Sequence, residues 1–387
     1  MKFKGLFLVF LLGFVVFLPA LSLYHSDVTV GVDDFYFGVS FGGEFAEEAL
    51  PLIDKVRDYT NFFVVASWGV ATNETALNLV CDYAADSGLY FVVFFDFISR
   101  TMYPWHQQWL DEAHYRWGDK FLGVYLNDEH GERQIDKLRH FTYATDYADA
   151  AERFMHAVKY GASGNATSMM DAKDKGVQLF TADQMLHWWV YLAGYDVVFT
   201  ELGWNETASR QIALGRGAAM VQNKEWGTII TWETDNPPYL GSDEQIYRYM
   251  VDSYRAGAKY VIVFNYPTHP EDNIYGILSD GQFEMMHQFW QYTQSYPRSI
   301  YGVVQADTVL VLPQNYGWGM RRSDYITVDP IWGIWPEDEK SPQILTNVQW
   351  METWRGLQFD IVYEDPRFDY SKLYPNIVYW NTTLPNG

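Results

Sequence analysis

The stretch Phe121-Leu-Gly-Val-Tyr-Leu-Asn-Asp-Glu-His-Gly131 decides the fold of this chain. Its first half is an apolar, aromatic-rich run of strand length, and its second half sets an amide, two carboxylates and an imidazole before a glycine. An unpaired buried charge is costly, so a buried strand that ends in adjacent charges should open onto water or a site. In parallel α/β barrels, functional groups lie at the carboxyl ends of the strands. The stretch therefore predicts one strand of such a barrel, ending at a site.

Similar runs lie on both sides of this stretch. Continuous apolar runs, rather than alternating ones, are typical of strands that are covered on both faces. The other expected strands are 35–41, 61–67, 89–95, 177–181, 196–200, 227–232 and 259–264. Two of the expected helices end at Tyr59 and Ala193. The other expected helices span 73–86, 105–117, 131–160, 206–221, 243–256 and 281–296. Eight strand–helix units over about 260 residues predict a (β/α)8 TIM barrel. A doubly wound sheet is disfavoured because no Gly-x-Gly-x-x-Gly turn follows a strand.

The composition changes after Arg298. Residues 308–313, 359–363 and 376–380 have strand patterns, and 343–355 has a helical pattern. This order predicts a small α/β domain, flavodoxin-like, over residues 299–387, after a barrel over 34–298. The segment 316–341 is rich in Gly, Trp and Pro, and long irregular segments often serve function or an interface.

The N-terminal segment has the pattern of a targeting signal rather than of part of the fold. Lys2 and Lys4 precede an apolar run from Gly5 to Leu18, then Pro19 and small residues. Residues 1–22 therefore predict a secretory signal peptide, with an uncleaved signal-anchor helix as the alternative. No second run is long enough to span a membrane, so we expect a mature chain without a membrane span, extracellular or at the cell surface. The sequence leaves a separate membrane anchor beyond Gly387 as an open alternative.

Composition and short motifs favour the same location. Asn-x-Thr sequons at Asn73, Asn165, Asn205 and Asn381 indicate a glycoprotein. The net charge of −22 argues against nucleic acid and anionic membranes as partners. The single cysteine, Cys81, excludes an intramolecular disulfide, and its apolar neighbours at helical spacing predict that it packs in the core.

The strand ends carry the candidate chemistry. They hold Glu44, Trp68, Asp96, Glu129, Glu201, Glu233 and Asn265. No strand end offers the paired histidines of metal-dependent amidohydrolases, a Schiff-base lysine or a glycine-rich phosphate loop, and one cysteine cannot hold an iron–sulfur cluster. No metal or cofactor is therefore expected. Carboxylates and aromatics remain, and glycoside hydrolysis needs little more than one carboxylic acid and one carboxylate.

Two strand ends support a family resemblance. Asn127-Asp-Glu129 and Thr231-Trp-Glu233 resemble the catalytic strand ends of the large clan of retaining glycoside hydrolases built on (β/α)8 barrels. The resemblance covers the barrel layout and these two ends, and it implies that Glu129 is the acid/base and Glu233 the nucleophile. Asp128 departs from the clan's Asn-Glu pair, which changes the side chain that points inward. The C-terminal domain resembles the extra domain of some β-galactosidases of that clan.

Other strand-end residues have alternative roles. Glu201 is the rival of Glu233 as the second carboxylate. Candidates for substrate binding are Asp96, Asn127, Asp128 and Asn265, together with Trp68, Trp204 and Trp232 as platforms for sugar rings. The alternatives are helix capping for Asp128 and Glu129, a loop or solvent role for Glu201 and Glu233, and core packing for the tryptophans.

Three function classes stay open. The favoured one is a glycoside hydrolase acting on an oligo- or polysaccharide. The second is a non-catalytic glycan-binding or structural surface glycoprotein, in which a homo-oligomer or a surface assembly is an option. The third is a metal-dependent hydrolase using Asp96, Asp128, Glu129 and His130, which is weaker because His130 lacks a spaced partner.

Overall fold

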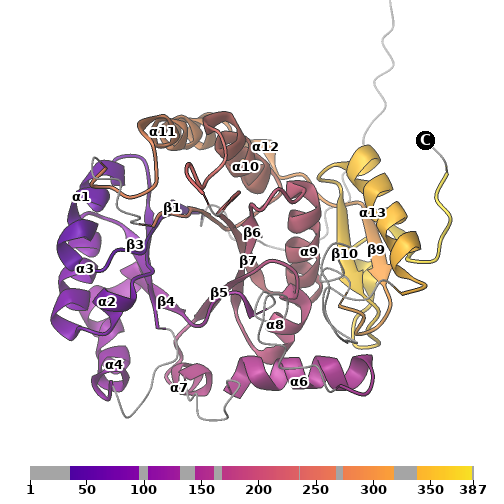
Figure 1. Ribbon diagram of the computed structural model, residues 1–387, viewed down its shortest axis with the longest axis horizontal. Coiled ribbons are helices and arrows are strands. Elements are labelled where there is room, and N and C mark those ends of the chain that lie inside the picture. The colour runs from indigo at the N-terminus through magenta and orange to yellow at the C-terminus, as the bar shows by residue number, and fades with distance from the viewer. Residues whose placement is uncertain are drawn as a thin grey trace, which may run out of the picture. The chain divides into compact units, whose positions relative to one another are not determined.

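The computed structural model describes residues 35–95, 103–130, 144–160, 168–234, 236–266, 273–317 and 338–385. Eight parallel strands close into a barrel in chain order, which confirms the predicted TIM barrel (Figure 1). The strands are β1 (Tyr36–Phe41), β2 (Phe62–Val65), β3 (Tyr90–Phe94), β4 (Phe121–Tyr125), β5 (Leu179–Asp183), β6 (Val197–Leu202), β7 (Glu225–Ile230) and β8 (Tyr260–Val263).

Helices surround the barrel (Figure 1). They are α1 (Ala46–Val56), α2 (Trp68–Ala71), α3 (Glu74–Asp86), α4 (Trp105–Trp117), the 3-10 helix η1 (Gly118–Lys120), α6 (Tyr147–Tyr160), α7 (Ser168–Asp174), α8 (His187–Ala193), α9 (Ala208–Val221), α10 (Asp243–Arg255) and α11 (Asp280–Ser295). The bounds of α4 agree with the prediction, whereas α7 lies in a segment for which no helix was predicted. Part of the long helix expected over 131–160 lies outside the described residues.

Alternate residues along the strands fill the barrel interior. This inner cluster consists of Phe62, Val64, Val92, Tyr125, Phe180, Ala182, Val197, Phe199, Ile229, Tyr260 and Ile262. The residues between them pack outward in the larger core shared with the helices. The interior is thus a packed core, and the strand alternation predicts which side chain at each carboxyl end points inward.

Gly123 allows β4 to approach the backbone just before β5 closely. The pairing of β3 with β4 shifts register at this point, and Gly123 has a φ of 153°. A Cβ at Gly123 would lie 2.2 Å from the carbonyl oxygen of Gln178. Only glycine combines this backbone angle with so close an approach to the next strand.

A second, three-stranded parallel sheet follows the barrel. It has the order β10-β9-β11, with β9 (Thr308–Leu312), β10 (Phe359–Tyr363) and β11 (Asn376–Tyr379). The accompanying helices are α12 (Arg298–Tyr301), α13 (Ser341–Arg355) and the 3-10 helix η3 (Tyr370–Lys372). The sheet is the small α/β unit that the sequence predicted. Residues 33–387 form one compact unit, and the boundary at 298/299 stays a prediction.

A buried ion pair joins this sheet to the barrel. The Arg216 guanidinium on α9 donates to the Asp360 carboxylate on β10 at 2.8 Å, and Tyr374 donates to the same carboxylate at 2.8 Å. Arg216 also donates to the carbonyl oxygens of Val304 (3.1 Å) and Phe359 (3.0 Å).

Aromatic side chains also join the barrel to this sheet. Trp188 and Trp189 of the barrel pack on Tyr363, while Trp354 is exposed. Of the barrel helices, α9 lies beside β10 (Figure 1).

Candidate functional site

The end of β4 leaves the strand in an unusual conformation. Asn127 and Glu129 have φ values of 51° and 50°, in the left-handed region that asparagine tolerates and glutamate rarely adopts. This breaks the alternation of the strand, and the Asp128 carboxylate accepts a hydrogen bond from the Tyr125 hydroxyl. Asp128, rather than Glu129, is therefore the carboxylate that bonds to a side chain of the barrel interior.

Tyr125 is the centre of this arrangement. Burial raises the pKa of Tyr125 well above its ordinary value, and the negative charges of Asp128 and Glu201 raise it further. The hydroxyl therefore stays protonated and donates a hydrogen bond to the Asp128 carboxylate. Sequence reasoning missed Tyr125, although its position two residues before Asn127 on an inward-facing spacing was an available signal.

Glu201 enters the same site from β6. It follows the inward-facing Phe199 by two residues, so its side chain points into the barrel. Only 3% of Glu201 is exposed. The Tyr125 ring lies 5.9 Å from the ring of Phe199, so Glu201, two residues further along β6, points into the same end of the barrel.

Glu233 faces a different direction. Its carboxylate accepts hydrogen bonds from the Asn205 backbone amide (2.8 Å), the Gln245 side chain (2.7 Å) and the Tyr249 hydroxyl (3.3 Å). Gln245 and Tyr249 belong to α10 in the helical layer. Glu233 thus ties the loops after β6 and β7 to α10.

The amides of the predicted site have contrasting surroundings. The Asn265 side chain donates to the Tyr275 carbonyl at 2.6 Å and accepts from the Ile277 amide at 3.0 Å, so it holds its own loop. Asn127 is buried, and its side-chain oxygen has no hydrogen-bond partner among the described residues. Asn127 is therefore the better placed of the two to meet a ligand.

His130 lies behind the site. The Tyr195 hydroxyl donates to the Leu126 carbonyl at 2.7 Å, so its oxygen accepts from the His130 Nε2–H group at 3.1 Å. This bond fixes His130 against β4. Asp96 lies outside the described residues.

Exposed aromatic side chains rim one side of the carboxyl end of the barrel, the mouth. Phe45, Trp68 and Tyr266 are 59%, 50% and 43% exposed and follow β1, β2 and β8. We call these three residues the aromatic arc. Because β8, β1 and β2 are neighbours in the closed order, the arc lies across the barrel from β4 to β6, which carry Asp128 and Glu201.

The predicted platforms fall into two groups. Trp68 is exposed, as a stacking role requires. Trp232 is half-buried against Phe264 and Tyr239, and Trp204 is half-buried with its indole nitrogen lacking a hydrogen-bond partner in the described part of the chain. The sequence did not single out Phe45 or Tyr266, because exposure is set by the folded loops.

Three further findings concern the described residues alone. No group of three or more His, Cys, Asp or Glu there is placed to hold a metal ion. In the same ranges, no helix is both long and apolar enough to cross a membrane. The sequon asparagines Asn73, Asn205 and Asn381 are exposed, and Asn165 and residues 1–22 lie outside these ranges.

Comparison with known proteins gives the fold. No family model and no curated protein matches this sequence. Among solved structures, α-L-fucosidase isoenzyme 2 from Paenibacillus thiaminolyticus is similar with a TM-score of 0.52 and 11% identity, over 89% of this chain and 59% of the fucosidase chain. What this comparison shows is the fold, a (β/α)8 barrel.

Other similar structures are more distant. The GH99 endo-α-mannosidase from Bacteroides thetaiotaomicron has a TM-score of 0.40 and 11% identity, over 66% of this chain and 80% of the mannosidase. A truncated 3-deoxy-D-arabino-heptulosonate 7-phosphate synthase from Thermotoga maritima has a TM-score of 0.38 and 12% identity, over 72% of this chain and 92% of the synthase. The present chain spans about three-fifths (59%) of the fucosidase's length.

Proposed function

We propose that this chain is a glycoside hydrolase that binds an oligo- or polysaccharide at the barrel mouth. The observation that carries the proposal is that Asp128, bonded to the Tyr125 hydroxyl, and the inward-pointing Glu201 lie at the same end of the barrel, across from the aromatic arc. Aromatic faces suit the C–H faces of sugar rings, and two carboxylates suit acid catalysis and attack at the anomeric carbon.

The hydrogen bond from Tyr125 assigns the roles. It stabilises the ionised carboxylate of Asp128, which acts as nucleophile or as general base toward water. Glu201 then donates the proton to the leaving oxygen. The pair differs from the resemblance-based assignment to Glu129 and Glu233, and both assignments enter the test below.

The test is hydrolysis of a glycan panel by the wild type and by Asp128→Asn, Glu201→Gln, Glu129→Gln and Glu233→Gln. Asp128→Asn and Glu201→Gln should each lower the rate by about 10²–10⁴-fold. Glu233→Gln should lower it much less, because its carboxylate is bound to Asn205 and α10. If Glu129→Gln and Glu233→Gln abolish activity instead, the clan's assignment holds and ours is wrong.

Product stereochemistry separates the two roles of Asp128. A retained anomeric configuration means that the carboxylate attacks the sugar directly, whereas inversion means that it activates water. Proton NMR of the first products would show which configuration forms.

The second candidate function is a non-catalytic glycan-binding barrel. The observation that favours it is the near-complete burial of Glu201, which would limit contact with a substrate. Wild-type protein that binds a glycan and cleaves none of the panel would establish this function.

We also propose that the protein is a secreted or cell-surface glycoprotein. The support is the pattern of residues 1–22 and the sequons in the sequence. Mass spectrometry of protein recovered from the medium tests this, since the mature chain should begin near residue 23 and carry glycan mass.

A further inference from the structure

A cavity of about 210 Å³ lies outside the barrel, between α6, α8 and the loops that follow β9 and β10. Met155 on α6 and Leu192 on α8 contribute apolar surface to its lining. Gln314, Asp365 and Arg367 contribute an amide, a carboxylate and a guanidinium from the two loops. It therefore combines apolar surface with groups that can bind hydroxyls, at an interface between the barrel and the C-terminal sheet, where ligand sites often occur.

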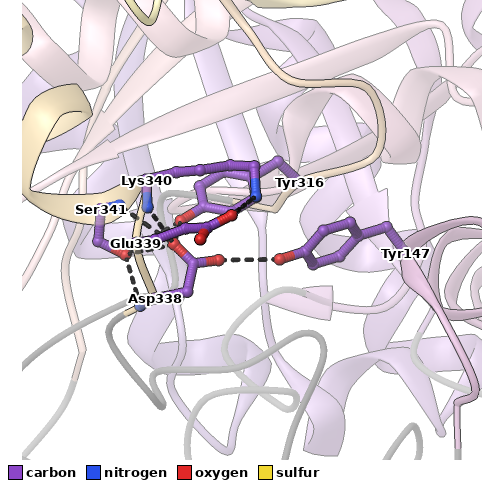
Figure 2. A network of polar contacts seen from close by, with 6 residues as sticks. All are labelled: Tyr147, Tyr316, Asp338, Glu339, Lys340 and Ser341. Atoms are coloured by element: carbon purple, nitrogen blue, oxygen red, sulfur yellow. Dashed lines mark hydrogen bonds and ion pairs between the residues drawn. The ribbon is translucent and has the colours of Figure 1, made fainter.

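Hydrogen bonds hold the two sides of this cavity together (Figure 2). The Asp338 carboxylate accepts from the Tyr147 hydroxyl at 2.8 Å and from the Tyr316 hydroxyl at 2.5 Å. Tyr147 adjoins the lining residue Ala148, and Tyr316 adjoins the lining residue Asn315. Backbone amides of Lys340 and Ser341 bind the same carboxylate at 2.9 Å and 3.1 Å. A cavity with walls fixed in this way loses little entropy when it binds a ligand.

The charges of the cavity disfavour anions. Arg367 is paired with Asp365, its Nε atom lying 2.8 Å from one carboxylate oxygen, so the two charges compensate each other. The side chain of Asp365 is only 7% exposed. Glu152 adds a further negative charge to the lining. A phosphate or a carboxylate would therefore be repelled, whereas hydroxyls can both donate to and accept from these groups.

We propose that this cavity is an ancillary site for one neutral sugar residue. Its volume suits a single pyranose ring, whose C–H face would lie on Met155 and Leu192 and whose hydroxyls would meet Gln314 and Asp365. It shares no lining residue with the mouth, so the site would retain a glycan whether or not the barrel hydrolyses it.

The experiment measures binding of methyl glycosides of glucose, galactose, mannose, fucose and N-acetylglucosamine by saturation-transfer NMR, with inorganic phosphate as the anion. A dissociation constant of roughly millimolar size is expected for a ligand this small. Ala148→Trp should fill the cavity from an exposed position and abolish the part of the binding that Trp68→Ala leaves unchanged. His156→Trp, at an exposed position of the same helix that does not line the cavity, is the matched control and should bind as the wild type does.

Further variants separate the cavity from the mouth. Gln314→Ala should weaken binding by about 2- to 10-fold, through the loss of one hydrogen-bonding amide. Trp68→Ala removes part of the aromatic arc and should leave this binding unchanged. The proposal is overturned if no glycoside binds, if phosphate binds instead, or if Trp68→Ala abolishes binding while Ala148→Trp does not. A failure to hydrolyse any glycan would leave these results unaffected.

Discussion

At the scale of single residues, the Tyr125 hydroxyl determines which carboxylate at the end of β4 is held at the barrel interior. It lies in the barrel interior and donates a hydrogen bond to the carboxylate of Asp128. The residues on either side of Asp128, Asn127 and Glu129, have left-handed backbone conformations. Sequence alternation alone would place Asn127 inward and Asp128 outward, so this hydrogen bond records how the strand end departs from the regular pattern.

Tyr125→Phe should lower the free energy of unfolding by about 1.5–3 kcal/mol, since a hydrogen bond to a charged group is lost. The pKa of Tyr125 lies well above its ordinary value, so the hydroxyl stays protonated and the loss should be the same at every pH from about 5 to 9. Urea unfolding across this range measures it. A loss that grows or vanishes with pH in that window would show that Tyr125 or its partner Asp128 changes ionisation there.

Asp360 predicts a pH dependence of stability. Burial raises the pKa of Asp360 above its ordinary value, even though Arg216 and Tyr374 act in the opposite direction. The folded chain then binds a proton more tightly than the unfolded chain does. The resulting stabilisation is complete below the unfolded pKa of about 3.9 and is lost as pH rises through the folded pKa.

The wild type should therefore lose stability relative to Asp360→Asn as pH rises from about 4. Urea unfolding of both proteins at a series of pH values tests this, with Asp365→Asn as a control, because the hydrogen bonds from Arg367 outweigh burial and lower the pKa of Asp365. If the stability of the wild type relative to Asp360→Asn increased as the pH rose, the predicted direction would be wrong.

At the scale of elements, β4 depends on Gly123. A side chain there would meet the Gln178 carbonyl at 2.2 Å, whereas Gly88 has a φ of 84° and nothing within 4 Å of its added Cβ. Gly123→Ala should cost about 3 kcal/mol or more, and Gly88→Ala only about 1–2 kcal/mol, because the second change adds backbone strain without a clash. Thermal and urea unfolding of the two variants would compare them. Equal costs would mean that β4 can move away from β5.

At the scale of the whole molecule, one ion pair couples the barrel to the C-terminal sheet. Arg216 is 4% exposed and Asp360 1% exposed. Arg216→Met leaves a buried carboxylate without its counterion and should cost about 3–5 kcal/mol. Arg210→Met on the same helix removes more exposed ion pairs, with Glu206 and Glu352, and should cost about 1 kcal/mol or less.

Calorimetry gives the measurement for this pair of variants. One transition in the wild type would mean that the barrel and the sheet unfold together, in line with the single compact unit of residues 33–387. Two transitions would instead support the independent domain that the sequence predicts after residue 298. An Arg216→Met cost no larger than that of Arg210→Met would show that the ion pair does not couple them.

The sequence by itself determined the architecture. Apolar runs ending in polar groups predicted a parallel barrel, and local signals predicted elements closely, as in Trp105–Trp117 for α4 and Phe359–Tyr363 for β10. Cys81 packs with Leu77, Val80 and Ala84 on the buried face of α3, as their helical spacing predicted. These properties depend on periodicity and burial, which neighbouring residues specify.

Only the tertiary structure decided how the strand-end groups are used. Glu201 and Glu233 end their strands in the same way in the sequence, yet Glu201 points inward beside Tyr125 whereas Glu233 binds α10. The exposure of Phe45 and Tyr266 and the cavity beside α6 likewise arise from segments far apart in the chain. The physical reason is that hydrogen-bond partners and solvent access depend on which segments meet in space, and one strand's pattern does not contain that information.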